Sequence, residues 1–438
     1  MLTQADIDYI IANEGADVTR LLLGAKGKKG DVNYPLCAKC IQAREKMKMK
    51  APLWYANAAL VYPFSVSVEQ GSSQATALFK QECIKTLFAE NLSGRKINTA
   101  DLTGGMGIDS YFISQIASTH YYFERNAELC AATEYNLRQL GANNIIVSNR
   151  DITADNCAVL RELQGKDISL IYIDPARRTQ TGSKAIMLQD YEPNIIELQE
   201  LLFAASRYVL VKVSPMADIK QNLQLLPKTS AVYVVAVNNE CKELLFLLDR
   251  QHTSPQEPPI FCCNVDILSN TLINNDLKNN TYKECKTKHP DYQLIVQNIV
   301  VKIQEEEQAQ AHYTSTVGKY LYEPGKAVLK GGAYKLLSQR YNCNKLAVST
   351  HLYTADNIIE QFPGKTFIVE ECIPFNKKAL KEIAARYPNA DITARNFPLD
   401  TNALKKLSGI KDGGCKHIFA VTLTNGDKVI ILTQPLLK

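Results

Sequence analysis

The stretch Asp101-Leu-Thr-Gly-Gly-Met-Gly-Ile-Asp109 lies between an apolar, strand-like run over residues 97–102 and a helical pattern that begins at Ile108. Its three glycines let the backbone turn tightly and come close to a ligand. The spacing differs from the G-x-G-x-x-G of dinucleotide sites, and the carboxylate of Asp101 would repel a pyrophosphate. The stretch therefore predicts a site for a cationic ligand, with a glycine-rich turn that binds nothing as the alternative.

Short apolar runs alternate with helical patterns from this stretch toward the C-terminus. The runs that predict strands are Ile97–Leu102, His120–Glu124, Asn144–Ser148, Ile168–Asp174, Tyr208–Val213, Ala231–Val237 and Leu244–Asp249. Such alternation is typical of a doubly wound α/β sheet with parallel strands. Only a few residues around Asn238 and Asn239 separate the last two runs, which predicts an antiparallel hairpin at the end of the sheet.

Acidic residues follow the ends of successive predicted strands. Glu124 ends the second strand about 20 residues after the glycines, where an acidic side chain accepts hydrogen bonds from ribose hydroxyls. Asp151, just beyond the third strand, is placed to accept from an adenine amine, with Ile152 against the ring. Each carboxylate alone could be a surface charge or a helix cap. Because ligands of open α/β sheets bind at this edge, these acidic residues together predict a nucleoside-containing ligand.

The fourth strand ends in Ile171-Tyr-Ile-Asp-Pro-Ala-Arg-Arg178, which places an acidic residue and a proline at the same edge. Asp174 and the carbonyl of Pro175 could accept the N–H groups of an exocyclic amine and orient its lone pair. A strand that ends in a capped turn is the alternative. Lys212-Val-Ser-Pro215 ends the fifth strand beside this edge, and it either lines the same pocket or forms an ordinary turn.

The segment Gln70–Asp174 resembles a class I S-adenosylmethionine-dependent methyltransferase, with the four motifs in order. The resemblance implies a Rossmann-like sheet, S-adenosylmethionine as the cofactor, and a catalytic motif formed by Asp174, Pro175, Ala176 and Arg177. It implies cofactor contacts from Gln70, Ser72, Ser73, Thr76, Asp101, Thr103, Gly104, Gly105, Gly107, Glu124, Arg125, Asp151 and Ile152. Relatives that methylate nucleobase amines usually carry a second proline and an aromatic residue where this chain has Ala176 and Arg177.

The whole chain resembles one bacterial family that adds further domains to this core. Its members have a helical N-terminal region, a small ferredoxin-like domain and a C-terminal THUMP-like domain. Tyr320-Leu-Tyr-Glu-Pro-Gly325 and Val369-Glu-Glu-Cys-Ile-Pro374 carry the match to the C-terminal part. The expected domains are residues 1–68 (helical), 69–255 (methyltransferase core), 256–318 (ferredoxin-like) and 319–438 (THUMP-like). THUMP domains bind RNA, so the resemblance implies RNA as a partner.

Composition and charge narrow the classes of function. A chain of 438 residues, 46% hydrophobic and 22% charged, is not expected to be largely disordered or fibrous. It contains no apolar run of the roughly 20 residues that a membrane helix needs. Without an export signal, its twelve cysteines are expected to be reduced thiols in the cytoplasm.

Both ends of the chain are basic. Residues 1–50 carry 9 Lys and Arg against 6 Asp and Glu, and residues 319–438 carry 18 against 10. The clusters comprise Lys26, Lys28, Lys29, Arg44, Lys46, Lys48 and Lys50 at one end, and Lys377, Lys378, Lys381, Arg386 and Arg395 at the other. Such clusters suit a polyanion such as RNA, and a solvated surface is the alternative.

No metal site is expected, since Cys37 and Cys40 have ligand spacing but no second pair nearby and the six histidines are scattered. The sequence thus predicts an S-adenosylmethionine-dependent methyltransferase of RNA, with a base amine as the acceptor and no membrane partner. A methyltransferase of a protein or small metabolite is one alternative. A module that binds S-adenosylmethionine without catalysis is the other.

Overall fold

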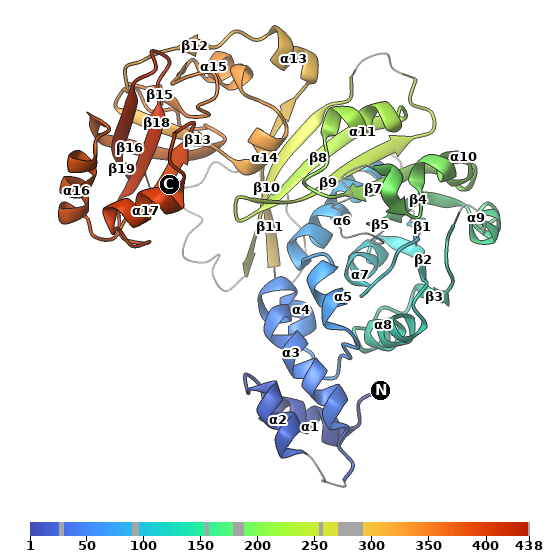
Figure 1. The fold of residues 1–438 in the computed structure, drawn as a ribbon. Helices are drawn as coiled ribbons and strands as arrows, with labels where there is room; N and C mark the ends of the chain where they lie inside the picture. Colours follow the sequence, from blue (N-terminus) through green and yellow to red (C-terminus); the bar gives the residue numbers. More distant parts are fainter. Residues whose placement is uncertain are drawn as a thin grey trace.

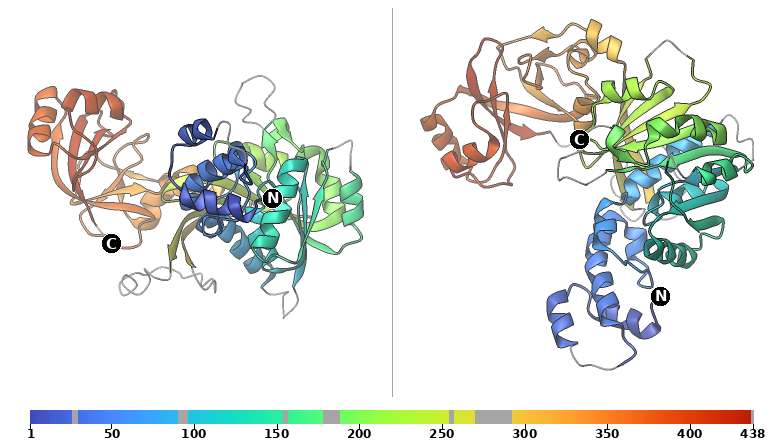
Figure 2. Two further views of the ribbon diagram at one scale, coloured as in Figure 1. Left: turned by 90° about the horizontal axis from the view of Figure 1, so that it is seen from below. Right: turned by 45° about the vertical axis from the view of Figure 1, so that its right-hand side comes forward.

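The structure is a computed structural model that describes residues 1–25, 30–89, 96–153, 157–177, 188–253, 257–269 and 292–436. Figure 1 shows a central α/β core, a group of N-terminal helices on one side of it and a second sheet formed by the C-terminal part of the chain. The N-terminal helices and the C-terminal sheet extend from the core in different directions (Figure 2).

The core is a nine-stranded sheet in the order β11-β10-β8-β9-β7-β4-β1-β2-β3. Seven of its strands are β1 (Ile97–Asp101), β2 (Ala117–Glu124), β3 (Ile145–Asn149), β4 (Ile168–Ile173), β7 (Ser206–Val213), β8 (Thr229–Val237) and β9 (Glu240–Asp249). The pairs between β1, β2, β3, β4 and β7 are parallel, whereas β9 runs antiparallel to both β7 and β8. The predicted doubly wound sheet with its antiparallel hairpin is confirmed, and β9 inserts between β7 and β8.

Two strands within residues 256–318, the region expected to be a separate ferredoxin-like domain, instead extend this sheet. Strand β10 (Ile260–Ser269) pairs in parallel with β8, and β11 (Tyr292–Val301) pairs antiparallel with β10. The physical reason is apolar surface on both faces of β10: Cys262 packs into the core on one face and Cys263 into the core on the other. A strand that is apolar on both faces is stable only between two covered layers. The Asn-rich stretch over residues 270–280, which the sequence predicts to be a loop, lies outside the described residues.

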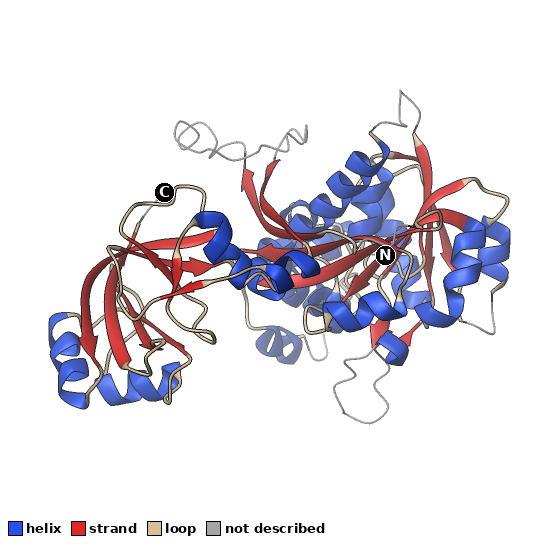
Figure 3. Cartoon of the chain, turned by 90° about the horizontal axis from the view of Figure 1, so that it is seen from above, coloured by secondary structure: helices blue, strands red, loops and turns tan. Residues whose placement is uncertain are grey.

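Helices cover both faces of the sheet (Figure 3). Residues of α6 (Gln74–Phe88), α7 (Ile108–Ser114) and α8 (Ala127–Gln139) pack into one apolar core. Residues of α9 (Ala158–Leu163), α10 (Ile195–Ala205) and α11 (Ile219–Leu225) pack into the core on the opposite face. The carboxyl ends of the parallel strands therefore form an edge between two helical layers.

The N-terminal helices are α1 (Gln4–Ala12), α2 (Val18–Gly24), α3 (Tyr34–Lys50), α4 (Pro52–Tyr55) and α5 (Ser65–Gln70). Asp17 caps α2 through the backbone N–H groups of Thr19 and Arg20, and a proline occupies the first turn of α3. Trp54 is fully buried and packs edge-on against Tyr111 of α7. These helices thus continue the core on the α6–α7 face of the sheet.

The C-terminal part forms an eight-stranded sheet in the order β12-β14-β15-β13-β16-β19-β18-β17. Its strands are β12 (His312–Tyr313), β13 (Tyr320–Pro324), β14 (Asn344–Lys345), β15 (Tyr353–Ala355), β16 (Gly364–Pro374), β17 (Asp391–Arg395), β18 (His417–Thr422) and β19 (Lys428–Pro435). Two helices, α16 (Lys377–Arg386) and α17 (Thr401–Ser408), cover one end of this sheet. The fold of this region is α+β, as expected.

The sequence predicts one helix over residues 327–341 and a strand over residues 346–349, and the structure differs at both places. The helix is divided into α14 (Lys326–Lys330) and α15 (Lys335–Tyr341), because Gly332 adopts a positive φ of 85°. Residues 346–349 form a turn, and the short strand β14 precedes it. Ala327, Val328 and Leu337 from these helices pack into the same core as α10, so the second sheet is joined to the first by apolar contacts.

Candidate active site

The glycine loop between β1 and α7 is packed so tightly that side chains are excluded. A Cβ atom at Gly104 would lie 2.0 Å from the ring of Tyr122, and Gly107 has a φ of 75°. The hydroxyl of Tyr122 donates to the carbonyl of Gly105 at 2.6 Å, and Thr133 donates to the same oxygen at 2.9 Å. Residues 104–107 therefore form a fixed backbone loop, which we call the glycine cradle, at the carboxyl edge of the sheet.

Asp101 lies beneath this loop and organises it. Its carboxylate accepts from the backbone N–H of Thr103 at 3.0 Å and from the hydroxyl of Ser110 at 2.6 Å. The side chain is almost fully buried, and burial raises the pKa of Asp101 to about 7 despite these two hydrogen bonds. A cation bound nearby would favour its ionised form.

The two other predicted carboxylates lie at the same edge. The carboxylate of Glu124 accepts from the N–H groups of Gly105 at 3.0 Å and Asn126 at 2.8 Å, which leaves lone pairs on both oxygens for a ligand. Asp151 is exposed, while Ile152 is buried in the core. Arg125 is exposed and forms an ion pair with Glu192 at 3.4 Å.

The segment that precedes these motifs links to the site through Ser72. Gln70 is exposed at the end of α5, whereas Ser73 and Thr76 bond to each other at the start of α6, where Ser73 is the N-cap. The hydroxyl of Ser72 donates to Asp109 at 2.6 Å. Of these four residues, Ser72 is therefore the one that the structure joins to the acidic residues.

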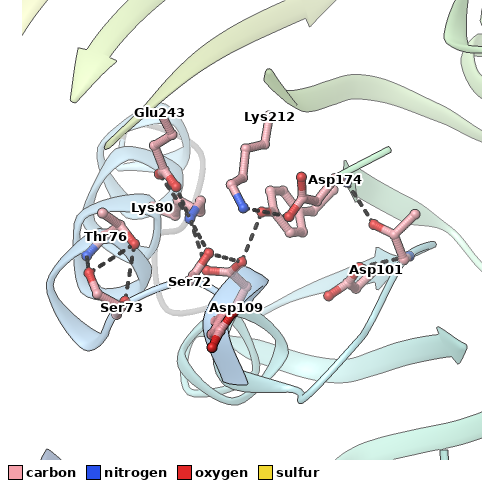
Figure 4. A network of polar contacts seen from close by, with 12 residues as sticks. Ser72, Ser73, Thr76, Lys80, Asp101, Asp109, Asp174, Lys212 and Glu243 are labelled. Carbon is pink, nitrogen blue, oxygen red and sulfur yellow. Dashed lines mark hydrogen bonds and ion pairs between the residues drawn. The ribbon is translucent and has the colours of Figure 1, made fainter. Parts of the chain in front are cut away.

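A buried ionic cluster, which we define as Lys80, Asp109, Asp174, Lys212 and Glu243, lies behind this edge (Figure 4). The ammonium of Lys80 is fully buried, with Asp109 at 3.0 Å and Glu243 at 2.9 Å. Burial opposes ionisation of Asp109, but the charges of Lys80 and Lys212 hold its pKa below the ordinary value. With three carboxylates and two ammonium groups, the cluster has a surplus of negative charge.

Lys212 and Asp174 form the part of the cluster closest to the end of β4. The Lys212 ammonium donates to Asp174 Oδ2 at 2.5 Å, and the backbone N–H of Asp174 donates to Thr103 Oγ1 at 2.6 Å. Burial lowers the pKa of Lys212, but Asp174, Glu243 and Asp109 together raise it above the usual range. Lys212 therefore remains protonated and holds one oxygen of a half-buried carboxylate.

Sequence reasoning considered Lys212 but missed the roles of Lys80, Asp109 and Glu243. A signal for Lys80 was available, because it lies on the same helix face as Thr76 and Ile84, at four-residue spacing within the buried stripe of α6. A lysine inside such a stripe needs a buried acidic partner. Nothing in the sequence indicates that this partner comes from β9.

The residues after Asp174 form a short ladder. Ala176–Arg177 (β5) pairs with Tyr191–Glu192 (β6), and Pro175 is buried. The sequence offers two tyrosines near this motif for stacking on a base, and neither is exposed: Tyr191 is buried in the core, and the Tyr172 hydroxyl donates to Asp109 at 2.9 Å. The side chain of Arg177 and the whole of Arg178 lie outside the described residues.

The arrangement fits a cationic, nucleoside-containing cofactor. A Cβ at Gly105 would have its nearest neighbour at 3.8 Å, so this part of the loop is open to a ligand, and the buried carboxylates attract positive charge. Within the ranges that the structure describes, no group of three or more His, Cys, Asp or Glu side chains is placed to hold a metal ion. Nor does any helix in those ranges have the length and apolar character to cross a membrane.

Comparisons with known proteins agree with this geometry. The model of a ferredoxin-like domain family matches residues 320–363, and the model of a THUMP domain-like family matches residues 364–435. A crystal structure from Porphyromonas gingivalis W83, of a protein classed as a methyltransferase, is 29% identical, covers 99% of this chain and 98% of its own, and superposes with a TM-score of 0.80. No curated protein matches the chain.

Two further solved structures match a smaller share of the chain. An rRNA methylase from Streptococcus thermophilus has a TM-score of 0.29 and 13% identity, and it covers 39% of this chain and 97% of its own. A protein from Streptococcus mutans classed as a methyltransferase and solved with SAH has a TM-score of 0.27 and 13% identity, over 38% and 96% of the two chains. The ferredoxin-like family model matches residues 320–363, which lie C-terminal to residues 256–318, where this domain was expected. The chain thus has the fold of a class I S-adenosylmethionine-dependent methyltransferase, is similar over nearly its full length to a protein classed as a methyltransferase, and contains regions similar to a ferredoxin-like and a THUMP domain-like family.

Proposed function

We propose that the protein methylates RNA, with an exocyclic amine of a base as the acceptor. The observation that carries the proposal is the match of residues 364–435 to a THUMP domain-like family, because THUMP domains bind RNA. This region shares its sheet with the ferredoxin-like region, which packs directly on the methyltransferase core. A bound RNA could thus contact the C-terminal region and the carboxyl edge of the core together.

Asp174 is the residue that we propose to bind the amine. Its Oδ2 is held by Lys212, whereas the side chain as a whole is 34% exposed, so its second oxygen can accept an N–H from the substrate. The carbonyl of Pro175 would accept the other N–H. Two such acceptors direct the lone pair of the amine away from the protein and toward the cofactor. Bound S-adenosylmethionine supplies the methyl group.

Lys212 acts through Asp174 in this proposal. The ammonium on Oδ2 fixes the plane of the carboxylate, and the hydrogen bond from the Asp174 N–H to Thr103 fixes its backbone. A rigid, charged acceptor lowers the entropy that the substrate must lose to reach a reactive orientation.

Several basic side chains near the two ends of the chain already bind other groups of the protein itself. Arg44 is buried against Glu14, Lys46 pairs with Glu69, and Lys50 donates to two backbone carbonyls of α5. Near the C-terminus, Arg386 pairs with Glu371, and Arg395 pairs with Glu323. Lys26, Lys28 and Lys29 lie outside the described residues. The best candidates for phosphate contacts are therefore the exposed lysines of α16.

We expect the triple variant Lys377→Ala/Lys378→Ala/Lys381→Ala to bind RNA more weakly, because all three side chains are exposed on the outer face of α16. If each lysine neutralises one phosphate of a single strand, the slope of log K against log salt falls by roughly 2. Fluorescence anisotropy at several salt concentrations measures this slope. Lys166→Ala, an exposed lysine of the core, serves as the control, and an unchanged slope in the triple variant would contradict the assignment.

Cofactor binding is expected to depend on pH through Asp101. Its carboxyl has a pKa of about 7 in the free protein, and a bound cation favours the ionised form, so binding releases a proton. The affinity for S-adenosylmethionine should then rise about tenfold between pH 6 and pH 8. Calorimetry at several pH values tests this. The Asp101→Asn variant should show no such rise, and an equal rise in that variant would exclude Asp101 as its source.

A further inference from the structure

A cavity of about 310 Å³ opens where the outer strands of the core sheet meet the ferredoxin-like region. One wall comes from the β8–β9 turn and from β10 and β11, and the other from the start of α14 and the start of β16. Helix α14 and strand β10, which contribute to these two walls, lie side by side in Figure 1. The cavity shares no residue with the buried ionic cluster, and its volume suits a ligand of nucleoside size.

The polar part of the lining consists mainly of amides. Five amide side chains line the cavity: Asn238, Asn239, Asn264, Gln297 and Asn298. Each amide offers both donors and an acceptor. The charged lining residues are one acid, Asp266, and one base, Lys365, so the lining has no net charge. A multivalent metal ion or a phosphate-rich group has too few opposite charges here, whereas an uncharged ligand rich in donors and acceptors is well matched.

Apolar side chains form the rest of the wall. Ile299, Val328 and Pro363 lie in the lining together with Cys262 and Ala327. An apolar surface beside a set of amides suits a flat heterocycle, whose faces are apolar and whose edge carries donors and acceptors. Asn and Gln are also the side chains that bind the edge of adenine with two hydrogen bonds.

The cavity is held open by its own hydrogen bonds. Asn264 accepts from the backbone N–H of Asn239 at 3.0 Å and donates to Asp266 at 3.2 Å. Asn239 accepts from the backbone N–H of Lys326 at 2.8 Å, which ties the β8–β9 turn to α14. Gln297, half-buried on β11, has no side-chain hydrogen bond to any residue that the structure describes. Its amide is thus available to a ligand.

We propose that this cavity binds one unpaired base of the RNA substrate, at a short distance along the strand from the methylated base. The proposal rests on RNA being the substrate. The cavity begins at the carboxyl end of β8, the same edge of the sheet at which Asp174 follows β4. Three to four strand spacings separate the two places, or roughly 14–19 Å. That distance corresponds to a few nucleotides, so the cavity would select the sequence around the target.

The Gln297→Met variant tests this assignment, because methionine keeps the length of the side chain and removes its donors and acceptor. The affinities of fluorescein-labelled A10, C10 and U10 RNA are measured for the wild type, for Gln297→Met and for Gln164→Met, which changes an exposed glutamine of the core. We expect the wild type and Gln164→Met to prefer one homopolymer at least fivefold. In Gln297→Met the preference should fall below twofold, with unchanged thermal unfolding and S-adenosylmethionine affinity.

The other outcomes separate two failures. Binding of RNA with the same preference in Gln297→Met, or with no preference in the wild type, would overturn the base-binding cavity and leave the RNA substrate intact. If the wild type binds none of the three RNAs while it binds S-adenosylmethionine, both the RNA substrate and the base-binding cavity are wrong.

Discussion

Replacing Lys80 with Met is expected to lower the free energy of unfolding by about 3–5 kcal/mol, the cost of leaving buried charges unpaired. The Lys80 ammonium contacts Ser72 at 3.1 Å, Asp109 at 3.0 Å and Glu243 at 2.9 Å. All of these groups are buried, so water cannot hydrate either carboxylate when the lysine is lost. Urea unfolding of the cofactor-free protein measures the loss.

The triple variant Lys80→Met/Asp109→Asn/Glu243→Gln separates charge from packing. It replaces the two carboxylates that lose their partner with neutral amides of the same shape. Replacing a buried ion pair with neutral groups often changes the free energy of unfolding little. We expect it to recover more than half of the stability that Lys80→Met loses. A Lys80→Met protein within 1 kcal/mol of the wild type would show that the buried ionic cluster does not depend on this lysine.

Replacing Asp174 with Ala is expected to slow methyl transfer about 100- to 1000-fold, the usual effect of removing one positioned hydrogen-bonding group from an active site. Cofactor affinity should change much less, because Asp174 is at the end of β4, where it is held by Lys212 and Thr103 and does not belong to the glycine cradle. Single-turnover transfer of labelled methyl groups into RNA measures the rate, and calorimetry measures the affinity.

Lys212→Met is the matched variant, since it leaves the Asp174 carboxylate in place but removes the cation that fixes it. We expect an intermediate loss of rate, because Asp174 then lacks the contact that fixes the orientation of its carboxylate. A lysine that only stabilised the fold would lower the free energy of unfolding without slowing methyl transfer by the folded protein. An Asp174→Ala protein as fast as the wild type would remove Asp174 from the reaction.

The core fold was predictable because its signals are local. Each parallel strand is a short apolar run, and the turn at Asn238 and Asn239, both of which adopt positive φ, marks the hairpin that β9 completes. The same holds for Asn425-Gly426 between β18 and β19, where Gly426 has a φ of 87°. By contrast, the sheet to which β10 belongs depends on its pairing with β8, a contact between distant segments that no local pattern reveals.

The placement of the candidate site residues was likewise predictable only where it follows from the strand topology. Asp101, Glu124 and Asp174 follow strand ends, so strand topology alone brings them to one edge. The partner that fixes Asp174 comes from β7, and the partner of Lys80 comes from β9. These pairings depend on the order of strands in space and on side-chain packing. The sequence contains the residues but not their pairing.

The most direct test of the account is the transfer of tritiated methyl groups from S-adenosylmethionine by the purified full-length protein. The acceptors are total RNA, protein and small-molecule fractions from a strain that lacks it, and the Asp174→Ala protein serves as the control. The account predicts label in RNA that is lost with the variant. Label confined to the protein or small-molecule fraction, or no label in any fraction from a protein that binds the cofactor, would contradict it.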